Sequence, residues 1–169
     1  MQSRSNPRKC RPRACASPAR QRGFTMTELV VTLTVAAILA AVATPSFQGI
    51  IATQRARTYA SALYATLSKA RSEAITLNAS VTLQPKAGGW QTGWQLLDVN
   101  NRVLDDYTGA TGVAVGGGPA QLIYRASGRL QAGAAPVFQI TTMNGSVPTH
   151  QCVSVDLSGR PYMQATVTC

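Results

Sequence analysis

The residue types that usually carry catalysis are sparse in this sequence. His150 is the only histidine among 169 residues, so it supplies neither a histidine-dependent triad nor a multi-histidine metal site. His150-x-Cys152 offers two metal ligands without an evident third, and we expect a loop histidine beside a structural cysteine. Asp105 and Asp106 are adjacent on an expected turn. This position is more typical of carboxylates that face solvent or a cation than of a pair in general acid–base catalysis. Ca²⁺ binding there would need more oxygen ligands than we can name. The sequence therefore predicts no enzyme, no cofactor and no metal.

Two further patterns that carry chemistry elsewhere are incomplete here. Ser127 and Ser146 adjoin glycines but lack the nucleophile-elbow pattern. The triple glycine 116–118 before Pro119 lacks a following Lys-Ser/Thr and opens no helix, so we expect a flexible loop rather than a phosphate cradle.

One carboxylate does stand in a place that needs a reason. Glu28 lies at the start of an apolar stretch, and no charge occurs between Leu29 and Ala43. A carboxylate at the centre of a membrane helix costs on the order of 2.5–3.5 kcal/mol, and less near the interface. An opposite charge paired with it in low dielectric would offset that cost. Thr25-x-x-Glu28 also matches a capping box at a helix start, and the two roles are compatible.

Charge and hydropathy divide the N-terminal part of the chain into a leader and an anchor. The net charge is +10, but residues 1–23 hold seven of the sixteen basic residues and no acid, so the remainder carries only +3. From Phe24 about 20 largely apolar residues follow, enough to cross the hydrocarbon core of a bilayer. We therefore predict a cytoplasmic basic leader over 1–23 and a transmembrane helix over 24–45, with the rest of the chain outside the cytoplasm.

A second helical segment follows Pro45, which is expected to end or kink the first one. Apolar residues recur at spacings of three and four over 46–78, which predicts an amphipathic helix. Its expected apolar face comprises Tyr59, Leu63, Leu67, Ala70, Ala74 and Leu77. Together the two segments form one very long, kinked helix.

Residues 79–169 have the pattern of a β-rich head. Short apolar segments alternate there with turn residues. The predicted strands are 81–84, 93–99, 121–124, 137–142 and 152–156, with 166–169 as a candidate last strand. The predicted turns are at 88–89, 100–101, 116–119, 127–128, 144–145 and 158–159. An antiparallel sheet covering the apolar stripe of the helix gives an α+β fold of two layers.

The four cysteines divide between the leader and the C-terminal end. Cys10 and Cys15 lie in the leader, while Cys152 and Cys169 would close a loop of about 18 residues worth roughly 3 kcal/mol as a disulfide. Such a bridge implies an oxidising compartment such as a periplasm. The alternative is two small buried thiols.

The segment Arg22-Gly23-Phe24-Thr25-Met26-Thr27-Glu28-Leu29 resembles the processing site of type IV pilins and type II secretion pseudopilins. A basic leader, a glycine before the cut, Phe after it and a glutamate five residues past the glycine all match. The resemblance implies a type IV pilin fold, cleavage after Gly23 by a prepilin peptidase, N-methylation of Phe24 by the same enzyme, and docking onto a neighbouring subunit through Glu28. Pro45 lies where many pilins also have a proline.

The head resembles the GspH/FimT group of minor subunits. The matching text is Trp90-Gln91-Thr92-Gly93-Trp94-Gln95-Leu96-Leu97-Asp98, then Ile123-Tyr124 with Ser127-Gly128, and Cys152-Val153-Ser154-Val155 with Ser158-Gly159-Arg160. The resemblance implies a minor pilin of a type IV pilus, FimT/FimU-like, or alternatively a GspH-like minor pseudopilin of type II secretion. Its implied partners are prepilin peptidase, other subunits and the inner membrane. The alternative role of Trp90 and Trp94 is packing in the core or on the sheet surface, which we expect for at least one of them.

DNA is a further partner that the FimT resemblance brings in. That group places basic residues around a Gly-Arg pair in the tail, and Gly159-Arg160 matches, although Pro161-Tyr162 follows and no second arginine is close. Arg125 and Arg129 would have to join Arg160 on one face. The alternative is three solvated arginines on turns.

A competing export route must also be considered. Ala41-Val42-Ala43 is an A-x-A pattern after an apolar core, as in a secretory signal peptide. Cleavage there would release a secreted binding domain that starts at Thr44.

Overall fold

The computed structural model describes residues 23–142, 148–166 and 169, with the backbone alone at 42–48. The leader up to residue 22, the expected turn at 144–145, Ser146, and positions 167–168 of the candidate last strand lie outside the described residues.

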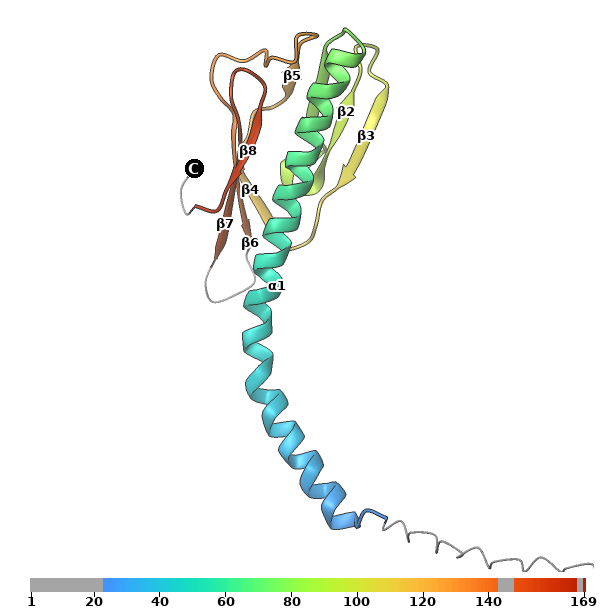
Figure 1. Cartoon of the computed structure of the whole chain (residues 1–169), viewed down its shortest axis with the longest axis vertical. Coiled ribbons are helices and arrows are strands. Elements are labelled where there is room, and N and C mark those ends of the chain that lie inside the picture. Colours follow the sequence, from blue (N-terminus) through green and yellow to red (C-terminus); the bar gives the residue numbers. More distant parts are fainter. Residues whose placement is uncertain (1–22, 143–147, 167–168) are drawn as a thin grey trace, which may run out of the picture. The chain divides into compact units, whose positions relative to one another are not determined.

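One α-helix, α1, runs from Met26 to Thr76 (Figure 1). Thr25 caps its first turn, because the backbone N–H of Glu28 donates to the Thr25 Oγ1 at 3.2 Å, as the Thr-x-x-Glu pattern predicted. The helix continues through Pro45, so Pro45 does not end it, and a kink there stays a prediction. The chain divides into two compact units, one up to Leu39 and one from Ala40 onward, and α1 belongs to both.

Within the described part of the chain, no helix combines the length and the apolar character that crossing a membrane requires.

The strands form two four-stranded antiparallel sheets, where the sequence suggested one. The first sheet has the order β3-β2-β1-β5, from β1 (Val81–Pro85), β2 (Gly93–Leu97), β3 (Val103–Thr108) and β5 (Leu122–Tyr124). The second has the order β4-β6-β7-β8, from β4 (Val113–Gly117), β6 (Val137–Thr142), β7 (Thr149–Val155) and β8 (Pro161–Gln164). A 3₁₀ turn, η1 (Trp90–Thr92), leads into β2. The helix-plus-antiparallel α+β architecture is thus confirmed.

The core of the second unit lies between α1 and both sheets. The helix contributes a stripe of small and large apolar residues, namely Ala56, Tyr59, Ala60, Leu63, Leu67, Ala70 and Ala74. β1, β2 and β5 of one sheet and β4, β6 and β7 of the other supply the opposing side chains. Each predicted residue of the stripe from Tyr59 to Ala74 is at most 1% exposed, so the stripe is confirmed over that range.

The end of the helix explains why Leu77 leaves this stripe. Asn78 adopts a left-handed conformation with φ of 48°, and the N–H of Ala79 donates to the carbonyl of Ala74. These features form the Schellman motif that ends a helix. Leu77, predicted to be part of the apolar face, lies just past α1 and is 43% exposed.

Two strands were not predicted, and one was misplaced. β3 carries two aspartates and β4 ends in glycines, so neither has the alternation of a typical strand. Gly116 and Gly117 pair with β6 rather than forming a flexible loop, and Gly118 leaves the strand with φ of 80° against the ring of Trp90. Among the described residues the last strand is Pro161–Gln164, and Thr166 and Cys169 of the candidate strand belong to no strand.

Candidate functional site: the helix start and the arginine turns

The predicted processing end of the chain is open to solvent. Gly23 has no heavy atom within 4 Å of where a Cβ would stand, and Phe24 is 80% exposed. Glu28 is exposed in the first turn of α1. Cleavage at Gly23, methylation of Phe24 and docking through Glu28 stay predictions, and this geometry leaves all three residues accessible.

An apolar helix surface follows Glu28 directly. Its exposed side chains are Leu29, Val30, Val31, Leu33, Val35, Ile38 and Leu39. The hydroxyls of Thr32 and Thr34 donate to the carbonyls of Leu29 and Val31 at 2.9 and 2.8 Å. Because these hydroxyls are already hydrogen-bonded within the helix, this surface can enter an apolar environment without leaving them unpaired.

The two tryptophans of the W-x-x-G-W pattern belong to the core. Trp94 is 1% exposed, stacks on Tyr107 at 4.2 Å between ring centroids, and donates its Nε1–H to the Thr66 Oγ1 at 3.1 Å. Trp90 donates its Nε1–H to the carbonyl of Pro119 at 2.8 Å. The packing interpretation is confirmed for both.

Asp105 and Asp106 lie on β3, so their placement on a turn was wrong. Successive residues of a strand point to opposite faces. Asp105 accordingly pairs with Lys69 of α1 at 3.0 Å, and Asp106 pairs with Lys86. The hydrogen bond from Lys86 is the main reason that the pKa of Asp106 lies below its ordinary value. The two carboxylates thus serve separate ion pairs.

His150 lies on β7 and not on a loop, which corrects the prediction. Its Nδ1 is 3.2 Å from the Thr141 Oγ1 on β6. The Cys152–Cys169 disulfide is formed, with 5.7 Å between the Cα atoms. Among the described residues, no three His, Cys, Asp or Glu side chains gather closely enough to hold a metal ion.

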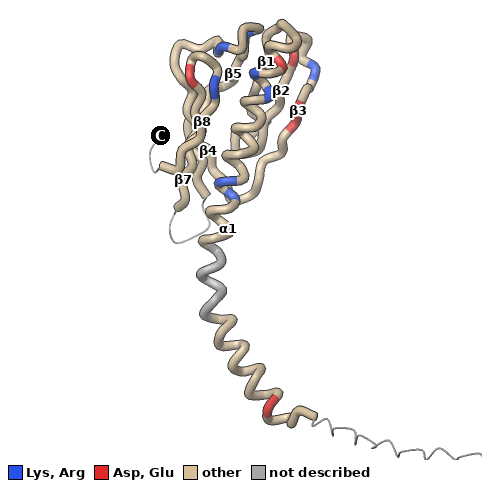
Figure 2. The backbone as a smooth tube through the Cα atoms, in the orientation of Figure 1, with Lys and Arg blue, Asp and Glu red and all other residues tan. Residues whose placement is uncertain are grey.

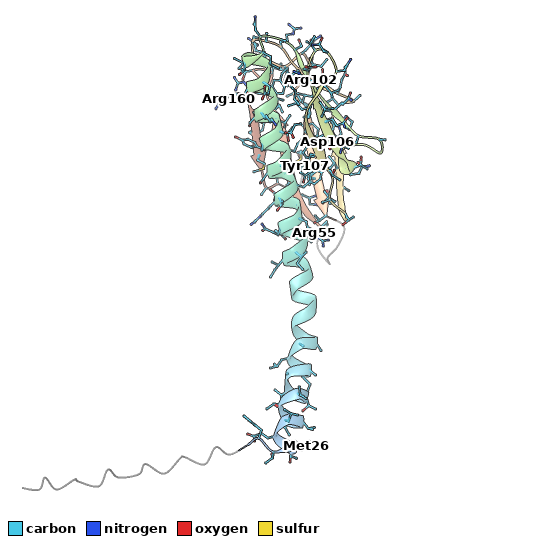
Figure 3. The ribbon with its side chains drawn as sticks, turned by 90° about the vertical axis from the view of Figure 1, so that its right-hand side faces the viewer. Met26, Arg55, Arg102, Asp106, Tyr107 and Arg160 are labelled. Atoms are coloured by element: carbon cyan, nitrogen blue, oxygen red, sulfur yellow. A yellow bond between two sulfur atoms is a disulfide. The ribbon has the colours of Figure 1, made fainter. Side chains whose placement is uncertain are left out.

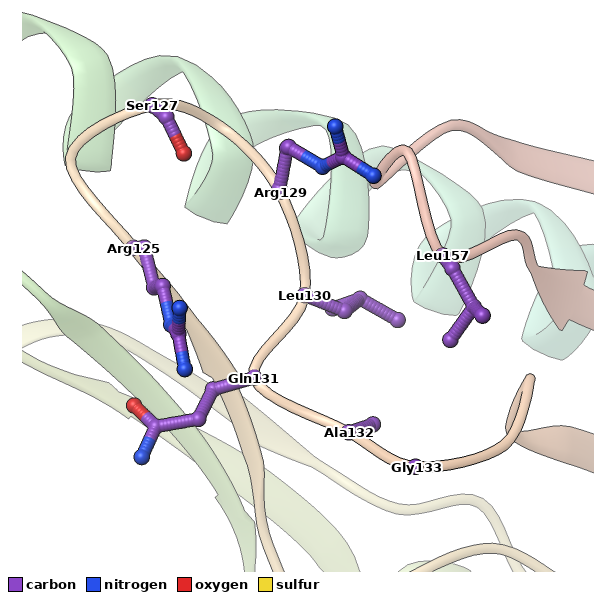
Figure 4. A pocket seen from close by; sticks show the side chains of 8 residues that line it. All are labelled: Arg125, Ser127, Arg129, Leu130, Gln131, Ala132, Gly133 and Leu157. Atoms are coloured by element: carbon purple, nitrogen blue, oxygen red, sulfur yellow. The ribbon is translucent and has the colours of Figure 1, made fainter.

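Arg125 and Arg129 lie on a tight turn that follows β5. The Arg125 N–H donates to the Arg129 carbonyl at 2.9 Å, and the Gly128 N–H donates to the Arg125 carbonyl at 2.8 Å. Gly128 has φ of 72°, a conformation that favours glycine. Both arginine side chains are exposed (Figure 4).

Arg160 lies on a second turn with the same backbone pattern, between β7 and β8. The Asp156 N–H donates to the Arg160 carbonyl at 3.1 Å, and the Gly159 N–H donates to the Asp156 carbonyl at 2.9 Å. The Asp156 carboxylate accepts from the Ser158 hydroxyl at 2.6 Å and from the Arg160 N–H at 2.9 Å. These bonds, that of Ser158 first, hold the pKa of Asp156 below its ordinary value. Ser-Gly-Arg occurs at 127–129 and again at 158–160.

The two turns touch through their glycines. A Cβ on Gly159 would lie 2.0 Å from the carbonyl oxygen of Gly128. The structure therefore brings the backbones that carry Arg125, Arg129 and Arg160 to one end of the head, where Figure 2 shows basic residues on the β5 side and beside β8. Figure 3 places Arg160 and Arg102 on opposite sides of α1 in its view.

A cavity of about 670 Å³ lies beside the first turn, and we call it the arginine pocket. It is lined by Arg125, Ser127, Arg129, Leu130, Gln131, Ala132, Gly133 and Leu157 (Figure 4). Arg160 is not among its lining residues. Sequence reasoning named the arginines but missed Leu130, Leu157 and the pairing of the turns, for which the repeated Ser-Gly-Arg was the available signal.

Comparisons with known proteins agree with this architecture. The family model described as "Type II transport protein GspH" matches residues 59–159, and the model described as "Prokaryotic N-terminal methylation motif" matches residues 18–44. Two crystal structures of the type IV minor pilin FimU of Pseudomonas aeruginosa (strain PAO1) are similar. One has 22% identity and a TM-score of 0.55 over 64% of this chain and 91% of that chain. The other has 21% identity and a TM-score of 0.56, and the match covers 64% of this chain and 87% of that chain.

No curated protein has a sequence that matches this chain. The likeness to FimU concerns the fold, and the GspH match covers more than half of the 169 residues; it includes the first arginine turn and the second as far as Gly159, but not Arg160. Together with the methylation motif over the predicted processing site, this match means that the chain is a type IV pilin-like protein and belongs to the GspH family.

Proposed function

We propose that this chain is a non-enzymatic minor subunit of a type IV pilus, anchored in the inner membrane before it is assembled. The observation that carries the proposal is the exposed apolar surface of α1 from Leu29 to Leu39, which lies inside the matched methylation motif of residues 18–44. Full burial of each Leu, Val or Ile side chain is worth roughly 1.5–3 kcal/mol, so this surface favours lipid or the helices of neighbouring subunits over water.

In the proposed sequence of events, prepilin peptidase cuts after Gly23 and methylates the new amino group of Phe24. The exposure of Gly23 and Phe24 suits access by such an enzyme. Glu28 then pairs with the amino group of a neighbouring subunit as the helix leaves the membrane. The Thr25 cap supports this step, because it satisfies the N–H of Glu28 and leaves the carboxylate available.

The proposed location places the leader in the cytoplasm and the head in the periplasm. The disulfide between Cys152 and Cys169 supports an oxidising compartment for the head. Residues 24–45 would be the single membrane-crossing segment, a proposal that rests on the apolar sequence and the matched methylation motif, since the side chains at 42–48 lie outside the described residues.

A pseudopilus of the type II secretion system is the alternative host filament, and the description of the matched family favours it. Deleting the gene and measuring surface pili beside secreted protein distinguishes the two. Loss of pili with normal secretion supports the pilus, and the reverse result supports the pseudopilus. DNA binding through Arg125, Arg129 and Arg160 stays a prediction.

The processing step is tested by the N-terminal mass of the protein extracted from membranes. Methylated Phe24 as the first residue is the expected result. A chain that starts at Thr44 would instead establish the released binding domain, and an intact leader would contradict both routes.

The docking step is tested with Glu28→Gln, which keeps the side chain's size and removes its charge. We expect Glu28→Gln to be processed normally and to be lost from sheared filaments. Glu73→Gln is the matched control, because Glu73 is the chain's other glutamate and also lies on α1. Normal incorporation of Glu28→Gln would remove the proposed role.

A further inference from the structure

We propose that the arginine pocket binds an acidic, partly apolar peptide segment of a neighbouring subunit. This inference rests on the proposed function, because a filament is what supplies such neighbours. The pocket would recognise one or two carboxylates beside an aliphatic side chain.

The charge of the pocket is not compensated from within the described chain. Among the residues that the structure describes, neither the Arg125 nor the Arg129 guanidinium forms an ion pair with a carboxylate. Three of the four aspartates of the head already pair with basic residues, in the pairs Lys69–Asp105, Lys86–Asp106 and Arg102–Asp98. The remaining one, Asp156, accepts two hydrogen bonds inside its own turn. The pocket thus keeps two positive charges for a ligand.

The backbone that presents these charges is held in place. Two hydrogen bonds close the Arg125–Arg129 turn, and the N–H of Gln131 donates to the Ile123 carbonyl at 2.9 Å just after it. The contact between Gly128 and Gly159 fixes this turn against the second one. A site whose backbone is already ordered loses less conformational entropy on binding, so even a short segment can bind measurably.

The rest of the lining favours a peptide over a nucleic acid. Leu130 is 7% exposed and Leu157 is 44% exposed, and Figure 4 shows the Leu130 side chain directed toward Leu157 between the two arginines and the 132–133 segment. None of the lining residues is aromatic, so the pocket has no platform on which bases would stack. Arginines beside apolar side chains are instead typical of protein–protein interfaces.

The test uses the full chain in uncharged detergent at about 0.15 M ionic strength, where long-range attraction is screened. The probes are a blocked peptide GLEDLG, its neutral counterpart GLQNLG and a single-stranded oligothymidylate. NMR signals of the arginine Nε–H groups report binding at individual residues. We expect GLEDLG to shift the signals of Arg125 and Arg129 in a saturable way, and GLQNLG to leave them unchanged.

Substitutions then assign the binding to the pocket. Arg125→Gln or Arg129→Gln should weaken GLEDLG binding about tenfold or more, equivalent to the loss of one charge-assisted contact. Arg57→Gln is the matched control, because it makes the same change of charge at an exposed position on α1. Thermal unfolding of each variant verifies that the head remains folded.

Three outcomes would overturn the inference. If GLQNLG binds as tightly as GLEDLG, the carboxylates play no role in binding. If Arg57→Gln weakens binding as much as Arg125→Gln or Arg129→Gln does, the effect comes from net charge and not from the pocket. Tighter binding of oligothymidylate through the same arginines assigns the site to nucleic acid. All of these are measured without filaments, so they are independent of the processing and Glu28 experiments that test the proposed function.

Discussion

Gly159 lies directly against the backbone of Gly128, although the two are 31 positions apart in the sequence and belong to turns that leave different sheets. A Cβ on Gly159 would lie 2.0 Å from the Gly128 carbonyl oxygen and 3.1 Å from the ring of Tyr124. Gly159 also has φ of 84°, which residues with a side chain rarely adopt. The contact therefore ties the end of β5 to the connection between β7 and β8.

Gly159→Ala should destabilise the head strongly. The added methyl group meets a backbone oxygen that cannot rotate away, and the left-handed conformation adds strain, so we expect a loss of about 3 kcal/mol or more. Chemical denaturation of the purified chain measures it.

Gly133→Ala is the control for that substitution. A Cβ there would meet nothing within 4 Å, and its φ lies outside the left-handed region. Its stability should change by no more than about 0.5 kcal/mol. Similar effects of the two substitutions would show that the Gly128–Gly159 contact does not hold the sheets together.

A buried hydrogen bond between the helix and β2 makes a second prediction. Thr66 accepts from the Trp94 indole N–H at 3.1 Å and donates its hydroxyl to the Ala62 carbonyl at 3.1 Å. Thr66→Val keeps the shape but leaves the indole N–H without an acceptor in the core, so it should cost about 1–3 kcal/mol.

The corresponding control and coupling test use neighbouring residues. Ser68→Ala removes a hydroxyl that bonds only to its own helix, at Tyr64, on the exposed side, and should have little effect. Adding Trp94→Phe to Thr66→Val should cost less than the sum of the single changes, because the orphaned donor is gone. Strict additivity would mean that this hydrogen bond contributes nothing.

The parts of this fold that the sequence predicted are those whose signal is local. The helical stripe from Tyr59 to Ala74 follows from spacing, and the Thr25 cap follows from a four-residue pattern. β3 and β4 were missed because their stability comes from neighbours, namely lysines for the aspartates of β3 and Trp90 packing for the glycine after β4.

The candidate site divides in the same way. Gly23, Phe24 and Glu28 were named from a contiguous motif. Arg160 was named from the Gly-Arg pair that the FimT resemblance brings in, and Arg125 and Arg129 as residues that would have to join it. That Leu157 would line a cavity with Arg125 depends on a contact between two sheets, which no periodicity encodes. The repeated Ser-Gly-Arg, from which no prediction was made, is the one local signal that relates the two turns.

Acid should weaken the head through its hydrogen-bonded aspartates. Asp98 accepts from the N–H groups of Asn100 and Arg102, each at 2.8 Å, and the bond from Arg102 is the main reason that its pKa lies below the ordinary 3.8. A lowered folded-state pKa gives stability that is present above the unfolded-state value and is lost as the pH falls through the folded-state value. We expect the unfolding midpoint to be level near neutral pH and to fall below about pH 4.

Asp98→Asn tests the assignment of that effect. The amide oxygen can still accept the turn N–H groups, but it does not titrate. The variant should be less stable at pH 7 and should lose less stability between pH 5 and pH 3 than the unmodified chain. An unchanged acid slope would exclude Asp98 as a contributor and leave Asp106 and Asp156, whose pKa values are also lowered.

The disulfide makes the last prediction, and its two cysteines are not equivalent. Cys152 is buried on β7, paired with Gln139 and Gln164, while Cys169 is exposed at the end of the sequence. Cys169→Ser removes the bridge with little disturbance of packing, so its cost should approach the loop-entropy value of about 3 kcal/mol. Cys152→Ser should cost more, because it also places a hydroxyl inside the sheet.

Reductant should lower the free energy of unfolding of the unmodified chain by as much as Cys169→Ser does, and it should leave the stability of the Cys169→Ser variant unchanged. If reductant destabilised the unmodified chain and the Cys169→Ser variant equally, the lost stability would come from other cysteines, which would contradict a structural role for this bridge.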